Sequence, residues 1–175
     1  LRRYWKPVVI FCLLCILIVD IISNRNWYHV LSEFTLNKHT SWYRGRLIEV
    51  ALFEGGMGGH WITGFGYGVE PGWGARIDGR NYTDMVNHYL LVLARHGLIG
   101  FIPFALLNVW VVKHLLKAWK KASTEADRYI VWGLSASFLS LALSSFSVSL
   151  EGPTSNVYFL MIGLAAALPD LMTPK

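Results

Sequence analysis

The sequence predicts an all-α protein, a polytopic transmembrane helical bundle with one large structured loop outside the membrane. Hydrophobic residues make up 54% of the 175 residues and charged residues only 15%, whereas soluble domains have about 25% charged residues. The apolar residues are grouped in long runs, and the basic residues gather in segments that flank those runs. These observations exclude a soluble globular domain, a disordered chain and a disulfide scaffold.

Four segments are apolar and long enough, or nearly so, to cross a bilayer, for which a helix needs about 20 residues. They cover residues 8–22, 97–116, 129–150 and 156–168. The chain begins with Leu1, and no small-residue cleavage site follows the first apolar stretch. We therefore expect the C-terminal part of a longer membrane protein, with a cleaved signal peptide as the alternative.

Basic residues predict the orientation of these helices. The N-terminal tip and segment 113–128 are rich in arginine and lysine. Segment 113–128 holds five basic and two acidic residues. Since positive residues mark cytoplasmic loops, we expect both on the cytoplasmic side and do not attribute the net charge of +5 to nucleic-acid binding. The expected parts are a first helix with its cytoplasmic tip (1–22), an outer loop (23–96) and three helices around the cytoplasmic loop (97–175).

The outer loop is too rich in aromatic residues to be disordered. It contains Trp42, Trp61 and Trp73, whereas disordered segments are poor in aromatic residues. Ten of the sixteen glycines of the chain fall between Gly55 and Gly79. Long loops with this degree of order are usually functional, so the loop is where functional residues are expected.

Two arginines are the first candidates. We expect a short helix over residues 46–53, stopped by Gly55, with Arg44 and Arg46 at its start. Arginine side chains and the free N–H groups of a helix start can bind an anion together. The alternative is a pair of ordinary interfacial arginines that contact lipid headgroups or Glu49.

Alternating glycines at residues 64–68 allow the backbone to turn sharply or to approach a ligand closely. No Lys-Ser or Lys-Thr follows, so the segment is not a P-loop. A tight turn is the default interpretation.

Segment 84–100 carries the second group of candidates. If it is helical from Asp84, then Asp84, His88 and Arg95 share one face that leads into the second span, with Asn87 beside them. Ionisable residues at membrane depth are usually functional, and an acid four residues before a histidine can orient its ring. The alternative is an amphipathic interfacial helix whose polar face contacts water. The histidines lack metal-ligand spacing, so we expect neither a metal nor another cofactor.

Together these segments resemble the C-terminal half of the bacterial O-antigen ligase/polymerase superfamily over residues 40–112. The shared features are an arginine at the start of a loop helix, a Gly-x-Gly-x-Gly stretch, and an Asn/His helix that enters a Gly-x-x-Gly span. In this chain they correspond to Arg44 and Arg46, residues 64–68, Asn87 and His88, and residues 97–100.

One departure from the family bears on function. Counting back from Gly97, Asn87 takes the place of the family asparagine, but Val86 stands where ligases have histidine. His88 lies on the other side of Asn87. This shift favours a polysaccharide polymerase over a ligase.

The resemblance implies an enzyme of the bacterial inner membrane, with loop 23–96 in the periplasm, that joins glycan repeats carried on undecaprenyl pyrophosphate. Its expected partners are this donor, an acceptor glycan, the lipid bilayer, and chain-length regulators or export proteins. A ligase to another acceptor and a non-enzymatic export or transport subunit are the alternatives. A transporter places essential charges inside its spans, whereas here they crowd the outer loop. The implied roles are pyrophosphate binding and catalysis by Arg44 and Arg46, an acceptor-orienting base at His88, and substrate binding by Asp84, Asn87 and Arg95.

Overall fold

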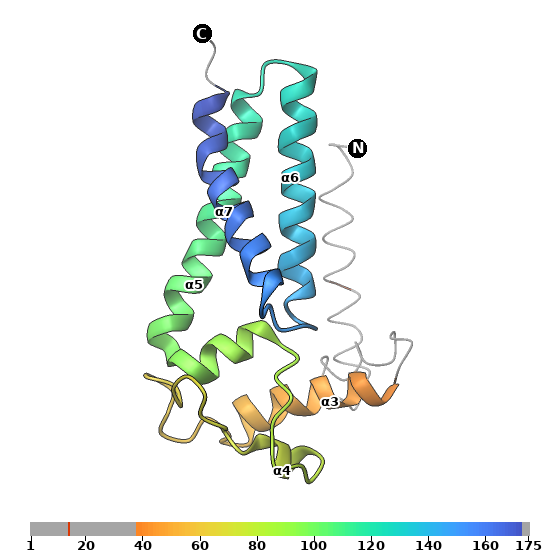
Figure 1. Cartoon of the computed structure of the whole chain (residues 1–175), viewed down its shortest axis with the longest axis vertical. Helices are drawn as coiled ribbons and strands as arrows, with labels where there is room; N and C mark the ends of the chain where they lie inside the picture. The colour runs from red at the N-terminus through yellow and green to blue at the C-terminus, as the bar shows by residue number, and fades with distance from the viewer. Residues whose placement is uncertain (1–13, 15–37, 173–175) are drawn as a thin grey trace. The chain divides into compact units, whose positions relative to one another are not determined.

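The computed structural model describes Leu14 and residues 38–172, and the chain divides into two compact units, residues 1–54 and 55–175 (Figure 1). All regular elements of the described residues are helices, with no strand among them, so the all-α prediction is confirmed. The predicted first membrane helix, residues 1–22, lies outside the described residues apart from Leu14.

Residues 38–53 of the first unit form two consecutive helices. Helix α3 covers Lys38–Ile48, and the π-helix η1 continues it over Glu49–Phe53. The helix ends where predicted, because Gly55 follows with a φ of +72°. It begins earlier than predicted, since neither glycine nor proline interrupts residues 38–44.

The second unit contains three long helices that pack against one another, α5 (His88–Lys121), α6 (Glu125–Ser144) and α7 (Pro153–Leu171). Residues 55–87, with the short helix α4 (Trp73–Ile77), lie at the end of the bundle where α5 begins and α6 is connected to α7 (Figure 1). This end of the unit carries the polar groups considered below.

Two predicted boundaries are wrong. The predicted cytoplasmic loop 113–128 is mostly helical: α5 runs to Lys121, and only residues 122–124 connect it to α6. Lysine is a good helix former, and a capping box of Thr124 and Asp127 starts the next helix at once. The third span was expected to reach residue 150, but α6 ends at Ser144 and residues 145–152 form the connection to α7.

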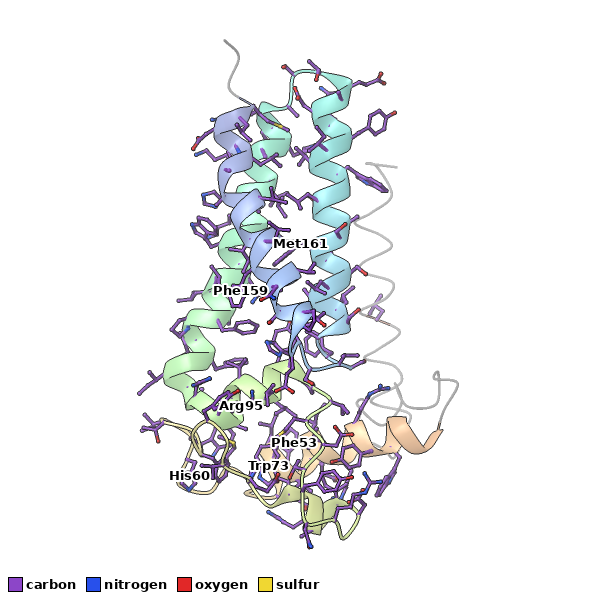
Figure 2. All side chains as sticks on the ribbon, in the orientation of Figure 1. Phe53, His60, Trp73, Arg95, Phe159 and Met161 are labelled. Carbon is purple, nitrogen blue, oxygen red and sulfur yellow. The ribbon has the colours of Figure 1, made fainter. Side chains whose placement is uncertain are left out.

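Helices α5 and α7 are long and apolar enough to cross a membrane, judged by length and composition alone. Only 28% of the apolar window of α5 and 22% of that of α7 is buried, far less than in the core helix of a soluble protein. Phe159, on α7, is one of many large apolar side chains left exposed (Figure 2). Helix α6 has 20 residues, but its first turn is charged, which shortens its apolar part.

Small and apolar side chains form the contact between the three helices. A polar pair adds to it, because the Tyr158 hydroxyl donates to Asn108 Oδ1 at 2.9 Å and thereby joins α7 to α5. Met161 packs against this core (Figure 2). The buried members are Val111, Leu115, Ala118, Ala122, Val131, Phe138, Leu150, Tyr158, Ala165, Leu168 and Met172.

Loop 55–87 has a core of its own around Trp73, which is only 1% exposed. The indole N–H donates to the Gly56 carbonyl at 2.9 Å, and the ring meets the edge of Phe65 at 6.0 Å. Phe65 in turn stacks on His60 at 4.3 Å. Loop 55–87 is therefore structured, as its aromatic content predicts.

A break at Gly97 divides α5 into a short first part and a long second part that run in different directions (Figure 1). Gly97 has φ +59° and ψ −161°, a conformation that favours glycine. The break exposes the carbonyls of Ala94 and Arg95, and the N–H groups of Phe65 and Gly66 bond to them at 2.7 and 3.1 Å.

Carbonyls of the same loop also accept hydrogen bonds from the backbone N–H groups that follow the break. The Leu98 N–H donates to the Trp61 carbonyl at 2.8 Å, and the Ile99 N–H donates to the Ile62 carbonyl at 3.2 Å. Two carbonyls before the break and two N–H groups after it therefore find partners in residues 61–66. We refer to residues 61–66 as the strap.

Replacing Gly97 by alanine is expected to disrupt the second unit. The added Cβ would lie 2.3 Å from the Ile62 carbonyl oxygen, on top of a strained backbone that by itself costs roughly 1–3 kcal/mol. The thermal midpoint and folded yield of purified Gly97→Ala protein in detergent should fall sharply. Gly163→Ala is the control, because a Cβ there meets nothing within 4 Å; equal behaviour of the two variants would contradict the role of the break.

Candidate functional site

A cavity of about 350 Å³ opens at the loop end of the second unit. Three parts of the chain line it: residues 68–71 and 82–85 of the loop, the first part of α5, and the connection between α6 and α7. Its size is in the usual range for small-molecule sites, which is about 300–1,000 Å³. The lining residues are Gly68, Val69, Glu70, Pro71, Tyr82, Thr83, Asp84, Met85, Leu91, Ala94, Arg95, Ser149 and Glu151.

Carboxylates dominate the charge of this cavity. Glu70, Asp84 and Glu151 line it, and Arg95 is the single basic residue among the lining side chains. An Arg95 Nη donates to a Glu151 carboxylate oxygen at 2.8 Å, and its guanidinium lies 4.8 Å from the centre of the Tyr67 ring. Arg95 is therefore already neutralised by an acid and held by an aromatic face. The cavity has an excess of negative charge.

Hydrogen bonds around Thr83 hold the loop side of the cavity. The Thr83 hydroxyl donates to Glu70 and accepts from the Gly74 N–H, the latter at 3.0 Å. Glu70 also accepts from the Gly72 N–H at 3.2 Å. The Glu70 carboxylate is therefore fixed in direction before any ligand binds.

His88 occupies a structural position next to this cavity. Its N–H donates to the Ser145 carbonyl at 2.8 Å, and its ring Nδ1 accepts from the Leu150 N–H at 3.1 Å. Because Nδ1 accepts from a backbone donor, the proton of the neutral ring is on Nε2. His88 can thus donate a hydrogen bond but has no free ring nitrogen to accept a proton, which argues against its expected role as a base.

The predicted helix from Asp84 starts too early. Residues 83–87 are not helical, and α5 begins at His88. Asn87 is its N-cap: the Asn87 side chain accepts from the Leu90 N–H at 3.1 Å and is buried. Asparagine favours this position over the helix interior because its side chain replaces a missing backbone acceptor. The expected stripe of Asp84, His88 and Arg95 on one helix face is therefore wrong, although Asp84 and Arg95 both line the cavity.

The two predicted arginines differ in the partners of their guanidinium groups. Arg46 binds Glu49 at 2.8 Å and also Glu54, and these hydrogen bonds raise the pKa of its guanidinium above the ordinary value. Arg44 has a buried Nε with no hydrogen-bond partner among the described residues. Both lie well inside α3, so the expected help from N–H groups at a helix start is wrong. Of the two, only Arg46 has its guanidinium bound by carboxylates among the described residues.

Comparison with known proteins identifies no relative of this chain. No family model matches the chain, and neither does any curated protein or solved structure. The resemblance to the O-antigen ligase/polymerase superfamily therefore stays a prediction, and the geometry alone carries the functional argument.

Sequence reasoning missed two acids of the cavity, Glu70 and Glu151. Glu151 had a detectable signal, because it is an acid in a short turn between two apolar helices on the side where Arg95 was expected. Glu70 had none, since its place depends on the fold of the glycine-rich loop. Among the described residues, no group of three or more His, Cys, Asp or Glu side chains can hold a metal ion.

Asparagine should replace His88 better than alanine does. The Asn side-chain oxygen can occupy the place of Nδ1 and accept from the Leu150 N–H, whereas alanine leaves that donor unpaired at a cost of about 1–3 kcal/mol. Thermal unfolding in detergent should give a clear loss of stability for His88→Ala and a smaller one for His88→Asn. Equal losses would mean that the ring is held by something other than this hydrogen bond.

Proposed function

We propose that the chain belongs to a membrane enzyme that joins glycan repeats carried on a polyprenyl pyrophosphate, with the cavity at the periplasmic face of the bacterial inner membrane. In this reaction an acceptor hydroxyl attacks the anomeric carbon of the donor. The bond from that carbon to the pyrophosphate oxygen breaks, and the hydroxyl loses its proton. A polymerase is the first candidate, and a ligase to another acceptor is the second.

The observation that carries this proposal is the acidic cavity at one end of an apolar helical bundle. Carboxylates accept hydrogen bonds from sugar hydroxyls, and the exposed Tyr82 ring offers an apolar face to a sugar. An excess of negative charge disfavours pyrophosphate and suits a neutral, hydroxyl-rich ligand. We therefore assign the cavity to the acceptor glycan rather than to the donor pyrophosphate.

The geometry also favours a carboxylate as the proton acceptor. His88 is occupied at Nδ1 and does not line the cavity, whereas Asp84 and Glu151 do. A carboxylate in the cavity can take the proton of the acceptor hydroxyl as the new bond forms. His88 then acts as a positioning residue for the connection between α6 and α7.

The leaving pyrophosphate gains negative charge as the donor bond breaks, so a cation must stabilise it. Arg44 is the better candidate for this role, because the guanidinium of Arg46 is bound by two carboxylates. No metal or other cofactor enters the proposed reaction.

Arg44→Ala should abolish long glycan chains at normal protein levels. Loss of one such charge contact typically costs about 10²–10³ in kcat. The test is complementation of the deleted full-length gene, with the surface polysaccharide run on a gel and membrane protein levels measured beside it. Arg80→Ala is the control, since Arg80 is exposed and pairs with Asp78. Single repeat units on the gel would support a polymerase, and long chains without attachment would support a ligase. Chains of normal length and attachment would contradict the assignment of Arg44.

Asp84→Asn and Glu151→Gln should weaken acceptor binding without changing donor binding. The measurement is the KM for added acceptor oligosaccharide and for lipid-linked donor, using the purified full-length enzyme. We expect the acceptor KM to rise by about tenfold or more, which corresponds to the loss of about 1.4 kcal/mol of binding free energy. Glu125→Gln, an exposed change at the start of α6, is the control. A rise in the donor KM alone would refute the assignment of the cavity.

A further inference from the structure

The strap carries two exposed apolar side chains that the proposed reaction does not use. Trp61 is 37% exposed and Ile62 is 63% exposed, although the loop around them is packed on Trp73. No Asp, Glu, Lys or Arg occurs in residues 55–69. Exposed tryptophan and isoleucine in an uncharged segment are typical of a surface that contacts something apolar.

Backbone hydrogen bonds place these side chains beside the apolar part of α5. The Trp61 and Ile62 carbonyls accept from Leu98 and Ile99, which are the first residues after the break. Ile99 is itself 64% exposed, and Ile102 continues the exposed apolar face one turn later. The strap and the start of the long part of α5 therefore form one continuous apolar surface.

The contact between strap and helix is too close to separate without breaking the fold. A Cβ on Gly64 would lie 2.6 Å from the Arg95 backbone, and a Cβ on Gly97 would lie 2.3 Å from the Ile62 oxygen. The strap consequently moves with α5, so whatever surrounds the start of the apolar helix also surrounds Trp61 and Ile62.

From this continuity we infer that the tip of the strap, Trp61 and Ile62, is inserted into the lipid bilayer beside the start of the long part of α5. Side chains of interfacial segments are buried about 5–10 Å into the boundary of headgroups and acyl chains. Tryptophan prefers this depth because its ring is apolar and its N–H is polar. Both carbonyls of the tip already have partners, which lowers the cost of placing them in apolar surroundings.

The test measures depth with a nitroxide spin label on Ile62→Cys in the full chain, reconstituted in phosphatidylcholine–phosphatidylglycerol vesicles. The background carries Cys12→Ser and Cys15→Ser, so only the introduced cysteine reacts. Val69→Cys is the matched control, because Val69 is also β-branched, is 54% exposed and lines the acidic cavity. Collision rates are recorded with molecular oxygen, which concentrates in the bilayer, and with a neutral nickel chelate, which stays in water.

The Ile62 label should lose most of its collisions with the nickel chelate and keep those with oxygen, whereas the Val69 label should behave in the opposite way. A label at Ile62 that meets the chelate as often as the Val69 label overturns the inference. Trp61→Phe supplies an independent measurement that needs no label. The difference between the emission of the unchanged chain and that of Trp61→Phe is the emission of Trp61. This difference should be quenched in vesicles of brominated lipid, and a difference that is not quenched overturns the inference.

Discussion

The second unit depends on the way in which residues 61–66 repair the break in α5. A helix that stops and restarts at Gly97 leaves carbonyls before the break and N–H groups after it without helical partners, and such groups need other partners when they are buried. The strap supplies two donors and two acceptors in the correct order. This requirement accounts for glycine at both Gly64 and Gly97, because no side chain fits where the two backbones meet.

The break also determines where the cavity lies. Because α5 changes direction at Gly97, its first part covers the end of the bundle and brings Arg95 to the connection between α6 and α7. Arg95 then reaches Glu151, which is 56 residues away in sequence. His88 ties the start of the same helix to Ser145 and Leu150. The polar end of the unit is thus assembled from three chain segments, each held by backbone or charged hydrogen bonds.

The charged groups of the two units suit different kinds of ligand. The cavity has more carboxylates than cations, which suits hydroxyl groups, whereas Arg44 in the first unit keeps a buried Nε without a partner among the described residues. Each of the two, taken by itself, therefore suits a different group: the cavity suits neutral hydroxyls, and the Arg44 guanidinium suits an anion. The exposed apolar faces of α5 and α7 suit a substrate that is anchored in lipid.

Much of the fold follows from the sequence alone. The apolar runs predict α5 and α7, Gly55 predicts the end of the first helix pair, and the aromatic residues predict an ordered loop, since each signal is local in the chain. The sequence predicts too early a start for α5, because Asn87 acts as a cap rather than as a helical residue, and only its bond to Leu90 reveals that. Tertiary structure alone decided which residues form the site. His88 accepts a hydrogen bond from Leu150, and Arg95 pairs with Glu151. Arg46 pairs with two carboxylates, which leaves it a poor candidate for binding an anion. Two of these three arrangements join residues more than fifty positions apart, where hydropathy and helical periodicity carry no information about contact.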